Sequence, residues 1–360
     1  MNILFAGGGS IGHIAPCVSV WRSIKTLDPQ ARAHIVCSQR QEDVEFLLKE
    51  HVPATPIRIP RLSPSMPITL WKGYKRMGEL FEKFQPDVVF SKGGAISVPV
   101  VMRAARHGVP IVLHESDAVF GRANRYLSRF ATVVCHGFSQ NMLRGKRSVY
   151  TGNPVRPEIT QGNKRIGLAL TGLSGEKPIL LVLGGSQGAQ ALNETVLRNL
   201  SGLLYYCDVV HLTGRGKTNV VTREGYWSAP FMHEELSHLY AIANLALSRA
   251  GAGGVSELAA NGIPSILVPL RGIAQDHQSA NARASEKSGG CIVVGQEELQ
   301  AKLLPTLSMM ISDMNKLQHM SVAMHSLSEP DASKHLAEIT LRVGREQRRG
   351  SMQRSEIVAK

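Results

Sequence analysis

Short, continuous apolar runs recur along the whole chain, and stretches with helical periodicity separate them. Runs that are apolar at every position are typical of parallel strands covered on both faces. An alternation of such strands with helices predicts an α/β fold built on doubly wound parallel sheets. The predicted strands are 2–6, 34–38, 87–91, 110–114, 132–136, 179–183, 208–212, 245–248, 265–269 and 291–294. Helical patterns between them include 42–50, 98–107, 190–200 and 277–288.

The length of 360 residues suits two domains of ordinary size. The apolar rhythm breaks at 151–178, where glycine, asparagine and proline cluster. We therefore expect a first domain over 1–156 and a second over 157–331. A helical stretch is expected over 332–344, and the basic residues 345–360 are predicted to be disordered.

The chain is basic, with a net charge of +13 and a pI of about 9.7. Such a balance favours acidic partners, namely nucleic acid, anionic lipid or phosphorylated substrates, and composition does not choose among them. The five cysteines show no CxxC spacing and are expected to be reduced thiols of a cytosolic protein. No run approaches the ~20 apolar residues that span a bilayer. Residues 2–6 are predicted to form a strand rather than part of a signal peptide. Any contact with a membrane is therefore expected to be peripheral.

The first predicted strand leads into the glycine-rich turn Gly7-Gly8-Gly9-Ser10-Ile11-Gly12-His13. This turn matches the pattern GxGxxG. The dinucleotide-binding fingerprint also requires an acidic residue at the end of the second strand, and the predicted strand 34–38 ends without one. A turn that needs small residues only for packing is the plain alternative. His13 opens the following helix, and it is either a structural histidine or a catalytic one.

Two further glycine-rich turns follow strands in the second half. Gly184-Gly185-Ser186-Gln187-Gly188 precedes a helix, and such a turn lets phosphate approach free backbone N–H groups. Residues 248–257 run through Ala252, Gly253 and Gly254 to Glu257. Glu257 either complements the helix dipole or accepts both hydroxyls of a ribose.

Other polar clusters also fall at strand ends, where open α/β sheets bind ligands. They are Lys92-Gly93-Gly94, the stretch from His114 to Asp117, and Asp276-His277-Gln278. His277 and Gln278 are suited to reading sugar hydroxyls, although Asp276 can equally be a simple N-cap. No D-x-D motif and no Cys/His cluster with zinc spacing occurs, so no metal and no cofactor are predicted.

Taken in this order, the motifs resemble the family of UDP-N-acetylglucosamine transferases that act on the lipid-linked N-acetylmuramyl-pentapeptide in peptidoglycan synthesis. The resemblance covers about residues 1–340. It implies a GT-B type fold, in which two Rossmann-like domains face a cleft and the last helix returns to the first domain. It also implies an inverting, metal-independent transfer. The matching stretches are 7–16, 92–94, 114–124, 152–156, 184–193, 249–257 and 276–282.

The resemblance also assigns roles to residues. Glu257 is expected to hold the ribose, and His277 with Gln278 to read N-acetylglucosamine. Either Phe231 or Met232 is expected to meet uracil through its backbone. The diphosphate is expected to contact Arg156, Gly185, Ser186, Gln187, Gly188, Ala252, Gly253 and Gly254.

On the acceptor side, the resemblance makes His13 the general base for the 4-hydroxyl, with Glu115 as the alternative base. Ser10, Gly12, Asp117 and Asn124 are expected to bind substrate. Ile11, Asp117, Gly253 and Gly254 depart from the family pattern. Asp117 stands where the family has an amide, and it can still accept hydrogen bonds from hydroxyl groups.

The predicted function is therefore an enzymatic one: transfer of N-acetylglucosamine from its UDP conjugate to the lipid-linked muramyl-pentapeptide, at the cytoplasmic face of the membrane and without nucleic acid. Three rivals remain. The first is another UDP-sugar glycolipid transferase or a UDP-sugar epimerase of the same fold. The second is an NAD(P)-dependent oxidoreductase, and the third is a UDP-sugar-binding regulator without catalysis.

The stretch Ser65–Phe84 is expected to dock on a membrane; it mixes apolar and basic residues, namely Ile68, Leu70, Trp71, Tyr74, Met77, Leu80 and Phe81 among Lys72, Lys75, Arg76 and Lys83. Leu70, Tyr74, Met77 and Phe81 fit one face of a helix, which either packs on its own domain or docks on a membrane. The lipid tail of the implied substrate and the charge of +13 favour docking on an anionic membrane surface.

Overall fold

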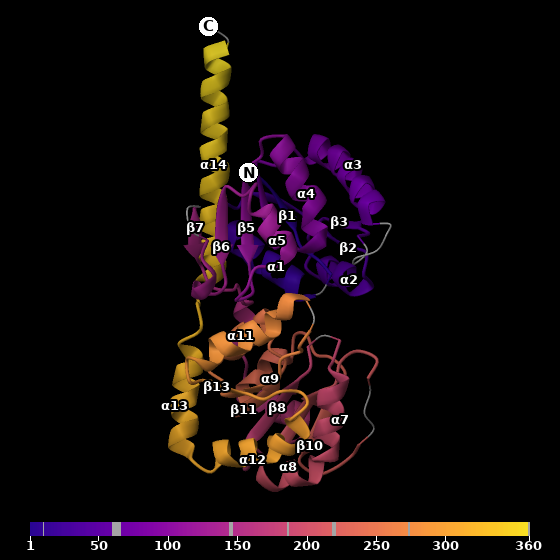
Figure 1. Cartoon of the computed structure of the whole chain (residues 1–360), viewed down its shortest axis with the longest axis vertical. Helices are drawn as coiled ribbons and strands as arrows, with labels where there is room; N and C mark the ends of the chain where they lie inside the picture. The colour runs from indigo at the N-terminus through magenta and orange to yellow at the C-terminus, as the bar shows by residue number, and fades with distance from the viewer. Residues whose placement is uncertain are drawn as a thin grey trace. The chain divides into compact units, whose positions relative to one another are not determined.

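The computed structural model describes residues 1–9, 11–59, 66–143, 147–185, 187–217, 221–272 and 274–358. It divides into two compact units (Figure 1). The first unit comprises Met1–Pro154 together with Pro330–Lys360, and the second comprises Val155–Glu329. Each unit is built on one sheet in which every strand pair is parallel, so the predicted class of two doubly wound parallel sheets is confirmed.

The first unit has a seven-stranded sheet in the order β3-β2-β1-β4-β5-β6-β7. The order reverses beside β1, which pairs with β2 on one side and β4 on the other. Ligands of open α/β sheets bind at the carboxyl ends of the strands at such a switch point. The strands are β1 Asn2–Ala6, β2 Arg32–Ser38, β3 Ala54–Ile57, β4 Val88–Ser91, β5 Ile111–Glu115, β6 Val133–His136 and β7 Ser148–Tyr150.

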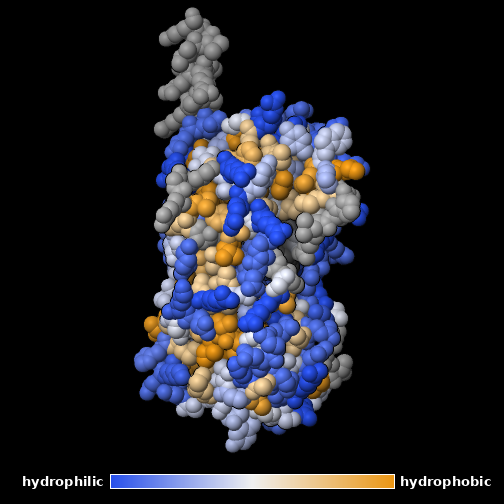
Figure 2. Space-filling model, viewed as in Figure 1, coloured by the Kyte–Doolittle hydropathy of each residue, from blue (hydrophilic) through white to orange (hydrophobic). Residues whose placement is uncertain are grey.

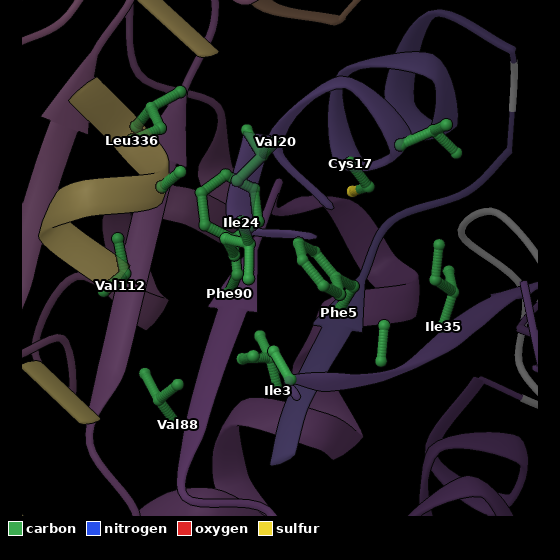
Figure 3. Packing of buried hydrophobic residues seen from close by; sticks show 14 of the residues in the cluster. Ile3, Phe5, Cys17, Val20, Ile24, Ile35, Val88, Phe90, Val112 and Leu336 are labelled. Atoms are coloured by element: carbon green, nitrogen blue, oxygen red, sulfur yellow. The ribbon is translucent and has the colours of Figure 1, made fainter. Parts of the chain in front are cut away.

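Helices cover both faces of this sheet. The core on one face joins side chains from β1, β4 and α1 to the last helix, α14; Phe5 and Phe90 meet there with ring centroids 5.5 Å apart, and Leu336 of α14 lies in the same cluster (Figure 3). The core on the other face is formed with α3, α4 and α5. The helices are α1 Ile11–Leu27, α2 Gln41–Lys49, α3 Met66–Phe84, α4 Gly94–Arg106, α5 Arg122–Leu127 and α14 Ala332–Val358, with a short 3-10 turn η1 at Ser139–Asn141.

The second unit has a six-stranded sheet in the order β10-β9-β8-β11-β12-β13, with its switch point beside β8. The strands are β8 Ile179–Leu183, β9 Asp208–Leu212, β10 Tyr226–Ala229, β11 Leu245–Ser248, β12 Ser265–Leu267 and β13 Cys291–Val293. The helices are α6 Lys164–Thr171, α7 Gln190–Arg198, α8 Leu200–Tyr206, α9 Leu236–Ile242, α10 Ala252–Ala260, α11 His277–Glu286, α12 Leu299–Ile311 and α13 Met314–His325, with 3-10 turns η2 Pro157–Thr160 and η3 Ala274–Asp276.

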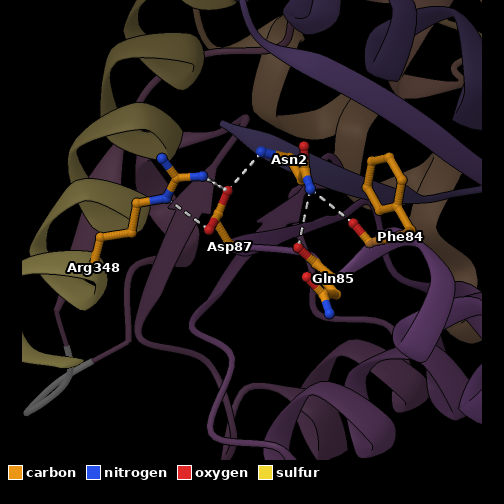
Figure 4. Close-up of polar contacts among 5 residues, drawn as sticks. All are labelled: Asn2, Phe84, Gln85, Asp87 and Arg348. Atoms are coloured by element: carbon orange, nitrogen blue, oxygen red, sulfur yellow. Dashed lines mark hydrogen bonds and ion pairs between the residues drawn. The ribbon is translucent and has the colours of Figure 1, made fainter. Parts of the chain in front are cut away.

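The C-terminal segment corrects one expectation. Residues 345–360 were expected to be disordered, whereas α14 continues without a break to Val358 (Figure 1). Arginine, glutamine and glutamate favour helix, and the first turn beyond residue 344 is also anchored. Arg348 forms a bidentate ion pair with Asp87, at 2.6 and 2.7 Å, and Asp87 accepts a hydrogen bond from the backbone N–H of Asn2 (Figure 4).

Helix α3 corrects a second expectation. Met77 and Phe81 are 0% and 4% exposed and pack in the core of their own unit, so the proposed docking face of Leu70, Tyr74, Met77 and Phe81 is wrong. Ile68 and Trp71, which the predicted docking stretch also includes, are the large apolar side chains of this helix that are exposed. Among the described residues, no helix is both long enough and apolar enough to cross a membrane.

Candidate functional site

The predicted motifs cluster at the two switch points. In the first unit, the Gly7–Gly9 turn follows β1 and the Lys92–Gly94 segment follows β4, its neighbour. In the second unit, the Gly184–Gly188 turn follows β8 and the segment from Arg249 follows β11. Each unit therefore gathers its candidate residues where a doubly wound sheet binds ligands.

A buried carboxylate holds the first glycine-rich turn. Asp43, at the start of α2, is 0% exposed, and its Oδ2 accepts hydrogen bonds from the N–H of Gly9 at 2.8 Å and from Ser38 Oγ at 2.5 Å. Gly9 has a φ of 94°, a conformation that glycine adopts readily. The acidic residue missing from the end of β2 is therefore supplied from the next helix, and it binds the turn itself rather than a ribose.

His13 lies in the first turn of α1 and is half-buried, while Gly12 beside it is exposed. The end of β1 passes close beneath this turn, because a Cβ added to Gly7 would lie 2.8 Å from the carbonyl oxygen of His13. The packing thus requires glycine at residue 7 and fixes the backbone that carries His13. Ser10 lies outside the described residues.

Glu115, at the end of β5, organises the segment that follows it. Its Oε1 accepts from the N–H of Asp117 at 3.1 Å, and its Oε2 accepts from the N–H of Gly121 at 3.1 Å and from Asn124 Nδ2 at 2.9 Å. Burial and the nearby Asp117 raise the pKa of Glu115, and these hydrogen bonds oppose the rise. The Oδ1 of Asn124 in turn accepts from the N–H of Gly94 at the start of α4.

A buried lysine links the ends of β4 and β5. Lys92 is 1% exposed, and its Nζ donates to His114 Nδ1 at 2.7 Å and to Ser116 Oγ. Burial lowers the pKa of Lys92 to about 8. His114 accepts this bond at Nδ1 and donates from Nε2 to the carbonyl oxygen of Gly152 at 3.0 Å, so the ring is the neutral Nε2–H tautomer. Burial and Lys92 hold the pKa of His114 well below its usual range.

The glycine-rich turn of the second unit is closed by its own backbone. The N–H of Gly188 donates to the carbonyl oxygen of Gly185 at 2.8 Å, and α7 begins two residues later. A Cβ on Gly188 would lie 2.0 Å from the carbonyl oxygen of Thr213, so the turn packs tightly on the loop after β9. From that loop, Lys217 Nζ donates to the carbonyl oxygen of Gly188 at 3.1 Å. Gln187 is exposed, and Ser186 lies outside the described residues.

Glu257 lies in the second turn of α10 and has a defined partner. Tyr240 on α9 donates from its hydroxyl to Glu257 Oε2 at 2.9 Å. Burial raises the pKa of Glu257, whereas the positive charge of Arg156 and the bond from Tyr240 lower it. The structure thus brings together Arg156 and Glu257, two predicted donor-binding residues 101 positions apart in the sequence.

The start of α10 has room for a ligand beside one of its glycines. A Cβ on Gly253 would meet nothing within 4 Å, while Ala252 is 7% exposed and Gly254 is half-buried. Arg249, immediately upstream, is used internally: its guanidinium donates to the carbonyl oxygen of Val268 at 3.1 Å and to Gln296 Oε1 at 2.6 Å. The first turn of this helix therefore presents backbone N–H groups with little side-chain bulk around them.

The remaining predicted donor contacts lie on the same unit. His277 and Gln278 begin α11 and are half-buried, and Gln278 Oε1 accepts from the N–H of Leu270 at 3.0 Å. Asp276 stands at the N-cap, but its side chain accepts from Ser279 Oγ at 2.8 Å instead of a backbone N–H. Met232 follows β10 and packs against the core.

Three residues that sequence reasoning missed support the predicted ones, namely Asp43, Lys217 and Tyr240. Each acts on a residue distant in the chain, so no local motif reports it. Within the described part of the chain, no group of three or more His, Cys, Asp or Glu side chains is arranged to hold a metal ion.

Models of a known family match most of this chain. The glycosyltransferase family 28 N-terminal domain matches residues 3–136, and the glycosyltransferase family 28 C-terminal domain matches residues 179–336.

Relatives from two bacteria carry one name, UDP-N-acetylglucosamine--N-acetylmuramyl-(pentapeptide) pyrophosphoryl-undecaprenol N-acetylglucosamine transferase. The protein of Clostridium botulinum strain Hall is 34% identical over 315 residues, which cover 84% of this chain and 88% of that protein. The protein of Lachnoclostridium phytofermentans is 36% identical over the same length and with the same coverage.

Solved structures share the fold. The crystal structure of Acinetobacter baumannii MurG matches with a TM-score of 0.74 at 23% identity, over 95% of this chain and 99% of that chain. The UDP-GlcNAc 2-epimerase of Neisseria meningitidis, crystallised with UDP-GlcNAc, matches with a TM-score of 0.69 at 15% identity, over 95% of this chain and 100% of that chain. At these identities the similarity concerns the fold alone.

Proposed function

The chain belongs to glycosyltransferase family 28, and from this membership we propose that it transfers N-acetylglucosamine from UDP-N-acetylglucosamine to the 4-hydroxyl of undecaprenyl-diphospho-N-acetylmuramyl-pentapeptide. The observation that carries the proposal is the extent of the similarity. Relatives at 34% and 36% identity, over 84% of this chain, carry the name of that activity.

The second unit supplies the donor site in this proposal. Glu257 accepts hydrogen bonds from the ribose hydroxyls, and the free N–H groups at the start of α10 together with Arg156 face the diphosphate. The turn after β8 contacts the diphosphate from the neighbouring strand, since β8 pairs with β11. Its contacting residues are Gly185, Gln187 and Gly188. His277 and the amide nitrogen of Gln278 contact the sugar, since the amide oxygen of Gln278 is already used by Leu270.

The reaction itself is an inverting displacement. The acceptor hydroxyl attacks the anomeric carbon, the new glycosidic C–O bond forms, and the bond to the UDP oxygen breaks from the opposite face. His13 takes the proton of the attacking hydroxyl, a role worth about 10²–10⁴-fold in rate. The helix N-termini and Arg156 stabilise the negative charge that grows on the departing diphosphate.

Glu115 acts as a positioning residue rather than as the base. Both of its carboxylate oxygens accept hydrogen bonds, and these fix the 117–124 segment that carries Asp117 and Asn124. Because a base must be able to reach the hydroxyl of the substrate, the half-buried His13 is the better candidate than the 3%-exposed Glu115.

Attachment to the cytoplasmic face of the membrane is proposed to use the exposed side of α3. Ile68 and Trp71 are 61% and 55% exposed, and Lys75 Nζ lies 4.0 Å from the centroid of the Trp71 ring. On neighbouring α4, Met102 is 40% exposed. Figure 2 shows hydrophobic side chains among hydrophilic ones over this part of the first unit. Apolar side chains enter the interface while lysines such as Lys72 and Lys75 attract anionic lipid.

The transfer is tested by incubating the full chain with labelled UDP-N-acetylglucosamine and the lipid-linked muramyl-pentapeptide, followed by product analysis. We expect labelled lipid-linked disaccharide and an equal amount of UDP. Conversion of the donor to an epimer without acceptor would instead assign an epimerase, and UDP-sugar binding without turnover would assign a regulator.

Membrane attachment is tested by co-sedimentation with phosphatidylglycerol-containing vesicles. The double variant Ile68→Ser/Trp71→Ser should lose binding, and Lys72→Gln and Lys75→Gln should each weaken it by about 1 kcal/mol at low salt. Tyr205→Ser is the matched control, because Tyr205 is 79% exposed and lies in the second unit. Equal sedimentation of all these variants would reject α3 as the docking surface.

A further inference from the structure

Tyr240 is a buried phenol with a functional partner. Its side chain is 3% exposed and belongs to the hydrophobic core formed with α9 and α10. Its hydroxyl donates to Glu257 Oε2 at 2.9 Å, and in the described part of the chain this is the hydrogen bond that satisfies it. A buried hydroxyl needs such a partner, so the pairing is stable.

Because of this bond, the two oxygens of the Glu257 carboxylate have different roles. Oε2 is occupied by Tyr240, whereas no described residue donates a hydrogen bond to Oε1. Burial raises the pKa of Tyr240 well above its usual value, and the adjacent Glu257 raises it further, so the phenol stays protonated and remains the donor. Glu257 therefore keeps its remaining acceptor capacity for a ligand.

We propose that Tyr240 is a positioning residue of the donor site, which holds the Glu257 carboxylate in the orientation that accepts the ribose hydroxyls and thereby sets the preference for a ribonucleoside diphosphate. This inference rests on the proposed binding of a UDP-sugar by the second unit. Without the phenol, the glutamate side chain has more rotamers available and must be ordered by the ligand itself, which weakens binding.

The charged groups around the carboxylate fit this role. Arg156, at the N-cap of η2, and Tyr240, on α9, both lower the pKa of Glu257 against the effect of its burial. Both groups oppose the effect of burial and favour the ionised form of the carboxylate. Loss of the phenol leaves Arg156 to do this alone, so the pKa of Glu257 rises further and the acceptor is protonated at a higher pH.

The substitution Tyr240→Phe isolates this role, because it keeps the ring that packs in the core and removes only the hydroxyl. Titration calorimetry on the full chain would compare UDP with 2′,3′-dideoxy-UDP, which lacks both ribose hydroxyls. Tyr205→Phe, at an exposed position of the same unit, is the matched control.

We expect the variant to bind UDP about five- to tenfold more weakly, with dideoxy-UDP affinity unchanged, so that the ratio between the two nucleotides shrinks. Its UDP affinity should also fall off at a higher pH than that of the unaltered protein as the solution is acidified. In turnover, the donor KM should rise while kcat stays within about twofold.

Several results would overturn the inference. Equal weakening of UDP and dideoxy-UDP would mean a merely structural tyrosine, and unchanged binding of both would mean no role at all. Coincident pH curves for the two proteins would contradict the electrostatic part. If the unaltered protein binds UDP and dideoxy-UDP equally well, or binds neither, the proposed ribose contact of Glu257 fails, and this inference fails with it.

Discussion

The glycine-rich turns after β1 and β8 look alike in sequence but differ in the charge of the side chain that bonds to each turn. In the first unit, the N–H of Gly9 is already bonded to the buried carboxylate of Asp43. In the second unit, the turn is closed by the backbone bond from Gly188 to Gly185, and the ammonium of Lys217 reaches the carbonyl oxygen of Gly188. The turn after β1 is therefore bonded to a carboxylate, and the turn after β8 is bonded to an ammonium group.

Because of this difference, the two turns are expected to differ in their affinity for a diphosphate. A diphosphate is attracted to helix N-termini and positive charge and is repelled by a nearby carboxylate. The second unit is therefore suited to the UDP part of the donor. The first turn is better suited to fixing the start of α1, and with it His13, than to binding a dinucleotide, so the resemblance to GxGxxG does not indicate an NAD(P) enzyme.

The largest expected effect concerns His13. His13→Ala should lower kcat about 10²-fold or more, because the proton acceptor is lost, while UDP affinity stays unchanged. Steady-state kinetics with a soluble acceptor analogue, paired with UDP titration, measures both quantities. His319→Ala, at an exposed position of α13, is the control. Near-normal turnover in the His13 variant would instead assign the role of general base to Glu115.

Glu257 should show the reverse pattern. Glu257→Gln should weaken UDP binding by about 1–3 kcal/mol, since charge-assisted bonds to the ribose are replaced by neutral ones. The measurement is titration calorimetry with UDP, and the control is Glu194→Gln, whose side chain is 48% exposed on α7. Unaltered UDP affinity in the Glu257 variant would remove this residue from the donor site.

Asp43 tests the first turn through stability. Asp43→Ala leaves the N–H of Gly9 and the hydroxyl of Ser38 without their acceptor, so the free energy of unfolding should fall by about 1–3 kcal/mol. Urea denaturation measures this change, with Glu42→Ala in the same helical turn as the control. UDP affinity should not change, and a parallel loss of UDP affinity would mean that the first turn also takes part in donor binding.

The smallest effect is expected at Lys217. Lys217→Met should weaken UDP binding by about 0.5–1 kcal/mol and flatten its salt dependence, because one positive charge near the diphosphate is removed. UDP titrations at low and high salt would detect this, with the exposed Lys164→Met as the control. Tighter binding in the variant would contradict a positive environment at the β8 turn.

The sequence predicted the central strands because they are buried on both faces and therefore apolar at every position. It missed β3, β7 and β10, which lie at sheet edges and are only partly buried, so their composition does not stand out. The glycine-rich turns and Glu257 could be proposed from the sequence because their signals are local. Asp43 and Tyr240 were not, because their partners lie 34 and 17 residues away and only the fold brings them together.

Hydrogen exchange of the full chain, with and without UDP, reports directly which of the two glycine-rich turns binds the donor. We expect UDP to slow exchange in peptides that cover Gly184–Gly188 and the start of α10, and to leave exchange in the Gly7–Gly9 turn unchanged. Slower exchange at Gly7–Gly9, with no change at Gly184–Gly188 or α10, would contradict the assignment of the donor to the second unit.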